Sequence, residues 1–380
     1  MHKYLLILFI LFSSQLFAQD LSIGLFSELS PKHYALTIQQ GTYSVRCDSL
    51  VLDTIAVNQN VSIQLESDII VCSIGDSVYK SKGVLVFEGN PDASFFINCV
   101  GLNTSLRCYK GDIRFVINNN YIRAINSIDL EDYVAAVVEA EAGYKHNLEY
   151  YKTQAVICRT YAISHIGRHK DEAYDLCDNV HCQMYPYKSM NEGIRTATQT
   201  TQGMILVDSS YVPIIAAYHS NSGGFTANSE DVWVSKVSYL RSVYDSISNV
   251  GNNAEWSVKL SLSEWKQFLI KYGVPNTIQD SLCMVKDFSR EKNILIDGVA
   301  IPVNDFRKEF QLRSAFFTTV LNVDTVQLMG KGYGHGVGLS QEGAMQLAIA
   351  GWDYQKILKH YYTGVFVVKL QTVQAFKQLK

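Results

Sequence analysis

Glycine occupies every second position from Gly330 to Gly338, in the run Gly-Lys-Gly-Tyr-Gly-His-Gly-Val-Gly. Such a run predicts a loop that comes very close to a ligand, because glycine accepts backbone conformations that other residues avoid. The spacing matches neither a phosphate-binding loop nor a convincing dinucleotide-binding turn. Ser340 follows as a candidate cap of a helix. His335, inside the run, is either a hydrogen-bonding or titrating group or a structural histidine.

Composition and the N-terminus limit where the protein works. The 380-residue chain has a net charge of −3 and no basic stripe, which argues against a nucleic-acid partner. Residues 1–18 read as a secretory signal peptide, too short for an ordinary membrane span, with an uncleaved anchor as the alternative. We therefore expect export to the periplasm or cell envelope, without an integral membrane span after cleavage. Among eight cysteines, Cys99 and Cys108 flank a turn and are candidates for a disulfide across a hairpin.

Strand-like and helix-like patterns come in separate blocks. Residues 20–125 contain short runs rich in β-branched and aromatic residues. The pattern then predicts a helix over 129–141, capped by Asp129 and ended by Gly143, and a second helix over 148–166. Such blocks, without strict alternation, predict a mixed α+β fold. Later segments predict strands at 203–207 and 212–217, and helices at 262–272, 340–350 and 354–362.

Glu141 is the leading candidate for acid–base chemistry. It lies at the predicted end of the first helix, where the partial negative charge of the helix terminus raises the pKa of a carboxyl group. A raised pKa suits a general acid. Glu139 points to a different face of the helix. The alternative is that both are solvated surface carboxylates.

Two other polar segments are candidates for ligand contacts. Gln154 and Arg159 interrupt an apolar helix, and a buried arginine needs a partner. Arg159 therefore either orients a carboxylate or sugar group or belongs to a structural ion pair. Residues 218–226 are crowded with hydroxyls and amides, which suits either carbohydrate recognition or a polar surface turn.

Cys177, His181 and Cys182 lie within six residues of one another. Thiolate and imidazole groups are typical zinc ligands, and His165 or His169 is a candidate for a further one. A local disulfide between the two cysteines is the alternative.

The ordered set of these motifs resembles the SpoIID/LytB family, the stage II sporulation protein D and amidase-enhancer group, over roughly residues 105–365. Five segments carry the resemblance, and residues 312–317 add a weaker sixth. They are 126–141, 154–162, 182–185, 219–232 with 239–243, and 334–341. Each is weak alone, but the ordered set is specific.

The resemblance implies an exported lytic transglycosylase that cleaves the MurNAc–GlcNAc bond of peptidoglycan and leaves 1,6-anhydroMurNAc ends. The alternative is a non-catalytic protein that binds glycan strands and enhances a partner cell-wall amidase. Glu141 falls on the family's catalytic acid/base, and catalysis needs no cofactor. A structural zinc near the Cys-Gln-x-Tyr segment of some relatives favours Cys177, His181 and Cys182 as metal ligands. The predicted substrate-binding residues are Arg159, Tyr161, Gln154, Tyr218, Ser220, Ser222, His335 and Gln341.

The resemblance also divides the chain and shows where it departs from the family. We predict a signal peptide (1–18), a β-rich N-terminal segment (19–105) and a SpoIID-like peptidoglycan-cleaving domain (106–370). The usual Glu-Met-Pro is replaced by Glu-Ala-Gly at 141–143, and bulky residues at 149–153 replace small ones. Tyr333 takes the place of a common Trp or Phe.

Overall fold

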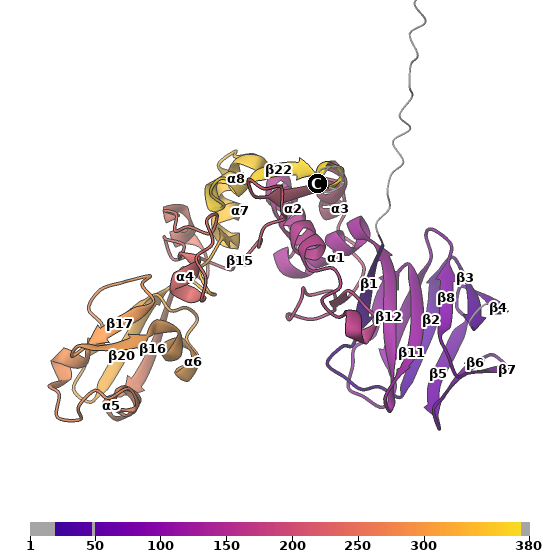
Figure 1. Cartoon of the computed structure of the whole chain (residues 1–380), viewed down its shortest axis with the longest axis horizontal. Coiled ribbons are helices and arrows are strands. Elements are labelled where there is room, and N and C mark those ends of the chain that lie inside the picture. Colours follow the sequence, from indigo (N-terminus) through magenta and orange to yellow (C-terminus); the bar gives the residue numbers. More distant parts are fainter. Residues whose placement is uncertain (1–19, 48–49, 374–380) are drawn as a thin grey trace, which may run out of the picture.

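The computed structural model describes residues 20–47 and 50–373, so the predicted signal peptide lies outside the described residues. Figure 1 shows three parts: a β-sandwich, a helical body next to it, and a smaller lobe at the far end. Helices and several sheets occur together, which confirms the predicted α+β class. No helix in the described part of the chain is both long and apolar enough to cross a bilayer.

The β-sandwich consists of two facing sheets. The first contains, in spatial order, β13 (Leu176–Cys177), β1 (Asp20–Leu25), β12 (Tyr121–Asp129), β11 (Asp112–Asn118), β8 (Leu85–Gly89), β3 (Thr42–Cys47) and β4 (Leu50–Ala56). The second contains β10 (Arg107–Lys110), β9 (Ser94–Cys99), β2 (His33–Gln40), β5 (Asn60–Glu66), β6 (Ile69–Ile74) and β7 (Ser77–Ser81). Alternate residues of each strand point inward. The rings of Tyr34 and Phe115 therefore meet across the two sheets, 5.5 Å apart.

Two expectations about this part need correction. The β-rich unit does not end near residue 105, because β10, β11 and β12 complete the two sheets and extend the unit to Asp129. The predicted boundary followed the start of the family resemblance, which does not coincide with an edge of the sandwich. The hairpin β9–β10 forms, but Cys108 lies opposite Phe96, so Cys99 and Cys108 are out of register and both are free thiols.

The helical body contains α1 (Leu130–Ala142), α2 (Leu148–Ser164), α3 (Glu192–Thr200), α4 (Ser229–Val232), α7 (Gln341–Ile349) and α8 (Tyr354–Tyr361). The predicted caps are confirmed. The Asp129 carboxylate accepts from the amide of Glu131 at 2.8 Å, and Ser340 caps α7. Gly143 ends α1 with a φ of 71°. A short sheet pairs β14 (Met204–Val207) with β22 (Phe366–Lys369).

The predicted strand at 212–217 does not form; only an isolated bridge joins Val207 and Pro213. Proline has no amide hydrogen for a β-ladder, which accounts for the interruption. Short 3₁₀ turns occupy Lys170–Glu172, Ser246–Val250 and Asp280–Cys283.

The smaller lobe is inserted between the helical elements and has its own core. It contains β16 (Glu255–Ser261), α5 (Leu262–Lys271), β17 (Asn293–Ile296), β18 (Val299–Pro302), α6 (Val303–Glu309), β19 (Phe317–Leu321) and β20 (Thr325–Lys331). Trp265, Phe268 and Phe306 pack at its centre, apart from the core shared by the sandwich and the helical body. We call residues 255–331 the inserted lobe.

Candidate active site

The glycine-rich loop lies against the loop that contains Tyr218. β15 (Tyr218–His219) pairs in parallel with β21 (Leu339–Ser340). At Gly338, φ is 72° and an added Cβ would lie 2.1 Å from the carbonyl oxygen of Ala217. Close packing against the backbone of Ala217 therefore requires glycine at this position, and the expected approach to a ligand stays a prediction. The alternating glycines let the two segments pack side by side.

Glu141 lies at the C-terminal end of α1, where three other segments converge. Its Oε1 accepts a hydrogen bond of 3.4 Å from the amide of Met184. Its backbone carbonyl accepts from the Gln341 side chain, also at 3.4 Å. The Tyr218 hydroxyl donates to its carboxyl group. The structure thus brings Glu141, Tyr218 and Gln341 together from distant parts of the chain.

Burial raises the pKa of the Glu141 carboxyl group, while the hydrogen bonds from Met184 and Tyr218 work in the opposite direction. The direction agrees with the prediction, but the main cause is removal of the charged form from water rather than the helix terminus. A carboxyl group held by two donors, with a raised pKa, has the properties of a proton donor.

His335 lies beside the same tyrosine. Its Nδ1 accepts from the amide of Val337 at 3.0 Å, and its ring hydrogen-bonds to the backbone of Tyr218. Burial, with smaller effects from Arg307 and Arg290, lowers the pKa of His335 to about 4. The imidazole is therefore neutral at neutral pH, and its single N–H is used in the hydrogen bond to the backbone of Tyr218.

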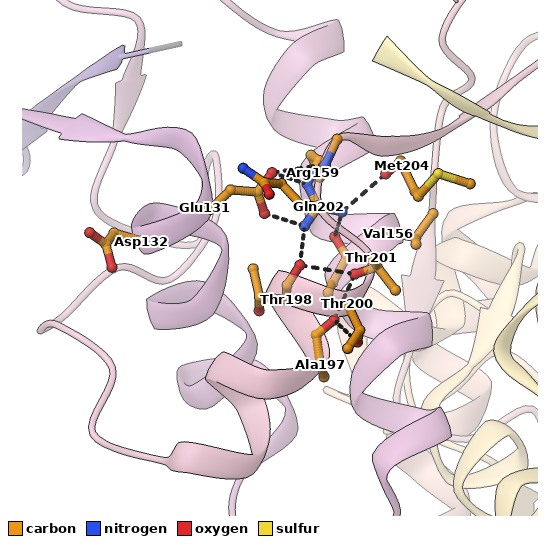
Figure 2. Close-up of polar contacts among 12 residues, drawn as sticks. Glu131, Asp132, Val156, Arg159, Ala197, Thr198, Thr200, Thr201, Gln202 and Met204 are labelled. Carbon is orange, nitrogen blue, oxygen red and sulfur yellow. Dashed lines mark hydrogen bonds and ion pairs between the residues drawn. The ribbon is translucent and has the colours of Figure 1, made fainter. Parts of the chain in front are cut away.

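Arg159 has a structural role in this arrangement, shown in Figure 2. Its side chain is 0% exposed and forms an ion pair with Glu131, with an Nε–Oε1 distance of 2.9 Å. Its other N–H groups donate to Glu131 Oε2 and to the carbonyls of Ala155, Thr198 and Met204. These five hydrogen bonds use every donor of the guanidinium. The ion-pair interpretation therefore describes Arg159, which has no free donor left for the predicted glycan contact.

Gln154 and Ser222 are also buried and do not face open solvent. Gln154 donates to Tyr150 at 3.2 Å, and Ser222 donates to Asp245 at 2.7 Å. Ser220 remains partly exposed and accepts from Asn253 at 3.1 Å. The hydroxyl-rich loop is thus partly a buried polar network, because the inserted lobe and α7 cover it.

Glu139 differs from the expected solvated carboxylate. It is only 2% exposed, and its Oε2 accepts from the hydroxyl of Ser189 and the amides of Met190 and Asn191 at 2.6–2.9 Å. It holds the segment that leads into α3 against α1.

A candidate metal site lies next to the sandwich. His169, Cys177, His181 and Cys182 place one potential ligand atom each within 4.8 Å of one another. Both cysteines are free thiols, so the local disulfide is not formed. His169 joins this cluster, whereas His165 stacks on Tyr161 with ring centroids 4.0 Å apart. Tyr161, predicted to bind substrate, lies beside the cysteine–histidine cluster, because its hydroxyl donates to the carbonyl of His181 at 3.5 Å.

The cluster fits zinc in its distances and surroundings. Zinc bonds of about 2.3 Å to sulfur and about 2.0 Å to nitrogen place tetrahedral ligands roughly 3.5 Å apart. The distance from Cys182 Sγ to His169 Nε2 is 3.5 Å, and that from Cys177 Sγ to His181 Nδ1 is 3.7 Å. Glu172 lies 2.9 Å from Nδ1 of His169, which leaves Nε2 available to a metal.

One neighbour of the cluster would have to move when a metal binds. Ligation through Nδ1 of His181 places the proton of that ring on Nε2. The Arg168 guanidinium, now 3.2 Å from Nε2, would then turn away.

Sequence reasoning missed several groups around Glu141. Met184 contributes only its backbone amide, which residue type does not reveal. Tyr150 and Cys158 are buried close enough for Glu141 to affect their pKa. In the sequence, only their place on the apolar face of a predicted helix could have pointed to these two residues.

Comparison with known proteins agrees with the motifs. Residues 118–207 match the family model described as stage II sporulation protein. An uncharacterised protein of Brachyspira hyodysenteriae is 34% identical over 273 residues, 70% of this chain and 73% of that protein. Stage II sporulation protein D of Bacillus amyloliquefaciens is 31% identical over 64% of this chain and 75% of its own length. The amidase enhancer of Bacillus subtilis is 28% identical, with 60% of this chain and 39% of that protein aligned.

The fold and these matches define a cell-wall protein of mixed α+β architecture. The chain belongs to the SpoIID/LytB family of stage II sporulation protein D and amidase enhancers.

Proposed function

We propose that this protein is an exported lytic transglycosylase that cleaves the MurNAc–GlcNAc bond of peptidoglycan strands with Glu141 as general acid and base. The observation that carries the proposal is the Glu141 carboxyl group, partly buried and held by the Met184 amide and the Tyr218 hydroxyl. Burial raises the pKa of this carboxyl group, so a larger fraction stays protonated than for an exposed glutamate.

In the proposed reaction, Glu141 gives its proton to the glycosidic oxygen as the bond to the muramic C1 breaks. The muramic 6-hydroxyl then bonds to C1 and gives its proton to the Glu141 carboxylate. The acid is regenerated and a 1,6-anhydro end is left. Because no water is activated, one carboxylate suffices, unlike the pair used by ordinary glycosidases. The Tyr218 hydroxyl is a donor placed to stabilise charge that develops on the acid, and neutral His335 positions Tyr218 through its backbone.

A zinc ion held by His169, Cys177, His181 and Cys182 would have a structural role in this proposal. With four protein ligands the coordination shell is closed, which is typical of structural zinc. Cys177 belongs to β13, which pairs with β1 of the sandwich, so the ion would connect the sandwich to the segment after α2. No step of the reaction passes through it.

Mass spectrometry of the products tests the proposal. The mature chain is incubated with peptide-free glycan strands, beside Glu141→Gln and the control Glu255→Gln, which changes an exposed glutamate of the inserted lobe. We expect anhydro ends from the wild type and the control, and none from Glu141→Gln. Products from Glu141→Gln at the wild-type rate would refute the assignment of the acid.

The second candidate is a non-catalytic enhancer that binds glycan and a cell-wall amidase. The alignment with the amidase enhancer of Bacillus subtilis and the replacement of Met-Pro after Glu141 favour it. It would be supported if the wild type binds strands without cutting them and increases stem-peptide release by an added amidase.

A further inference from the structure

A groove of roughly 600 Å³ opens beside His335, between the helical body and the inserted lobe. Its walls come from the end of α4, from α6 and from the glycine-rich loop. The residues that matter for its chemistry are Trp233, Arg307, Lys308, Arg313, Tyr333 and His335. The two parts are held together at this place. The side chain of Asn304 donates to Val232 O at 3.0 Å, and the amide of Gly334 donates to Arg313 O at 3.0 Å.

The groove carries positive charge without acidic partners. Arg307, Lys308 and Arg313 line it, and none of them forms an ion pair within the described residues. The acids on α4 and α6 accept hydrogen bonds from, or form ion pairs with, residues outside the groove; Asp231, for example, accepts from the Asn228 side chain. Glu230 pairs with Arg241, Glu309 pairs with Lys271, and Asp305 accepts from Tyr272.

A fourth cation, Arg290, lies partly buried under the glycine-rich loop. Its guanidinium donates to the carbonyls of Phe225 and Ser222 and packs over the Phe316 ring at 4.3 Å. A Cβ at position 336 would lie 2.5 Å from its Nη1. Burial, and then the charge of Arg307, lower the pKa of Arg290 to about 9. Charged groups removed from water are normally paired with an opposite charge. Arg290 has only carbonyl acceptors here, so a bound anion would be stabilised in this region.

Aromatic rings complete the groove. Trp233 and His335 are 5.5 Å apart, and Tyr333 is 44% exposed. Rings with an apolar face and a polar edge suit the faces and hydroxyls of sugars. The groove therefore combines surfaces for a sugar with cations for an acid.

Tyr218 connects the groove to the acid, because its hydroxyl contacts Glu141 while its backbone contacts His335. A glycan strand with its scissile bond at Glu141 would continue into the groove. In such a strand N-acetylglucosamine is neutral, and negative charge is carried on the lactyl arm of muramic acid, either as a free carboxylate or as carboxylates of an attached peptide.

We propose that this groove is a carboxylate-binding subsite in which Arg307 and Arg313 bind the acidic lactyl arm of a muramic acid residue. The inference rests on the proposed function. It adds that the acidic lactyl arm is the part of the glycan strand by which the protein positions it. Arginine suits this task because its planar fork matches a carboxylate.

Calorimetric titration tests the subsite in the Glu141→Gln protein, which holds a strand uncut. The ligands are a peptide-free GlcNAc–MurNAc oligomer, the same oligomer with stem peptides, and a GlcNAc oligomer of equal length. Arg307→Gln and Arg313→Gln are compared with Lys259→Gln, which removes an exposed charge on β16 of the inserted lobe. Arg313 is exposed, so its variant keeps the test valid if Arg307→Gln does not fold.

We expect acidic oligomers to bind about tenfold more tightly than the neutral one, a difference of about 1.4 kcal/mol. Either arginine variant should lose most of this difference, while Lys259→Gln and binding of the neutral oligomer stay unchanged. If only the peptide-free oligomer binds more tightly than the neutral one, the bound group is the lactyl carboxylate. If only the peptide-bearing oligomer does so, the bound group is a carboxylate of the stem peptide. Equal binding of acidic and neutral oligomers in all proteins would overturn the subsite and leave the proposed function intact. Absence of all glycan binding would overturn both.

Discussion

Removing the carboxylate opposite Arg159 should strongly destabilise the helical body. Arg159 is fully buried, and Glu131 supplies its only negative partner among the described residues (Figure 2). Removing one partner of a buried pair costs about 3–5 kcal/mol, because the remaining charge stays in a medium of low polarity. The Glu131 side chain is 17% exposed, so some water reaches the pair. We therefore expect Glu131→Gln to lower the free energy of unfolding by about 3 kcal/mol.

Arg159→Lys should be comparably costly for a different reason. An ammonium group has about three N–H donors, fewer than the five hydrogen bonds that Arg159 forms. At least two buried acceptors then lose their donor, at about 1–3 kcal/mol each.

Urea denaturation followed by far-UV circular dichroism measures both effects. Lys152→Gln is the matched control, since Lys152 forms a partly exposed ion pair of 2.7 Å with Glu149 on the same helix. Its loss should cost less than about 1 kcal/mol. The reasoning is refuted if Arg159→Lys keeps wild-type stability but binds glycan more weakly, because Arg159 would then act on the ligand.

Three further predictions concern the acid, the loop and the metal cluster. Because the folded-state pKa of Glu141 is raised, its contribution to stability is lost as pH rises through that pKa. Glu141→Gln should thus unfold at a higher temperature than wild type at pH ~7, with the difference vanishing below the pKa of an unfolded glutamate, about 4.3; an unchanged gap in acid would contradict this. Gly338→Ala should cost about 2–4 kcal/mol from positive φ plus a clash with the Ala217 carbonyl, whereas Gly351→Ala, with φ of 84° and nothing within 4 Å, should cost about 1 kcal/mol; equal losses in thermal melts would exclude the clash. The mature chain should bind about one zinc ion by elemental analysis and melt at a lower temperature after chelation, and Cys182→Ala but not His165→Ala should abolish both effects.

Helices with strong end signals could be predicted from the sequence. Asp129 and Ser340 cap the first turn of a helix and Gly143 ends one, in each case through contacts with residues close in sequence. The local sequence pattern was therefore enough to predict these helix ends. The separate core of the inserted lobe was missed, because periodicity shows that a residue is buried but not which other residues share its core.

The site was predictable only in part for the same physical reason. Glu141 could be found by its place at a helix end, but the amide that holds it belongs to Met184, and only the folded chain brings the two together. Arg159 and Ser222 were polar residues in a pattern typical of a binding site. Whether such residues contact a ligand or other residues of the same chain depends on burial, which the sequence does not show. His169 rather than His165 joins the metal cluster because α2 ends at Ser164 and the following turn redirects the chain.

The sandwich restricts how this protein can be shortened. The family match begins at residue 118, but β12 is hydrogen-bonded between β11 on one side and β1 on the other. A fragment that starts there would present two bare strand edges and uncover Ile122 and Ala124, features that promote aggregation. β13, which contains Cys177, would also lose β1, the strand with which it pairs. Recombinant fragments meant for enzymology or crystallisation should therefore begin at Asp20 or earlier, although the stretch before residue 118 lies outside the family match.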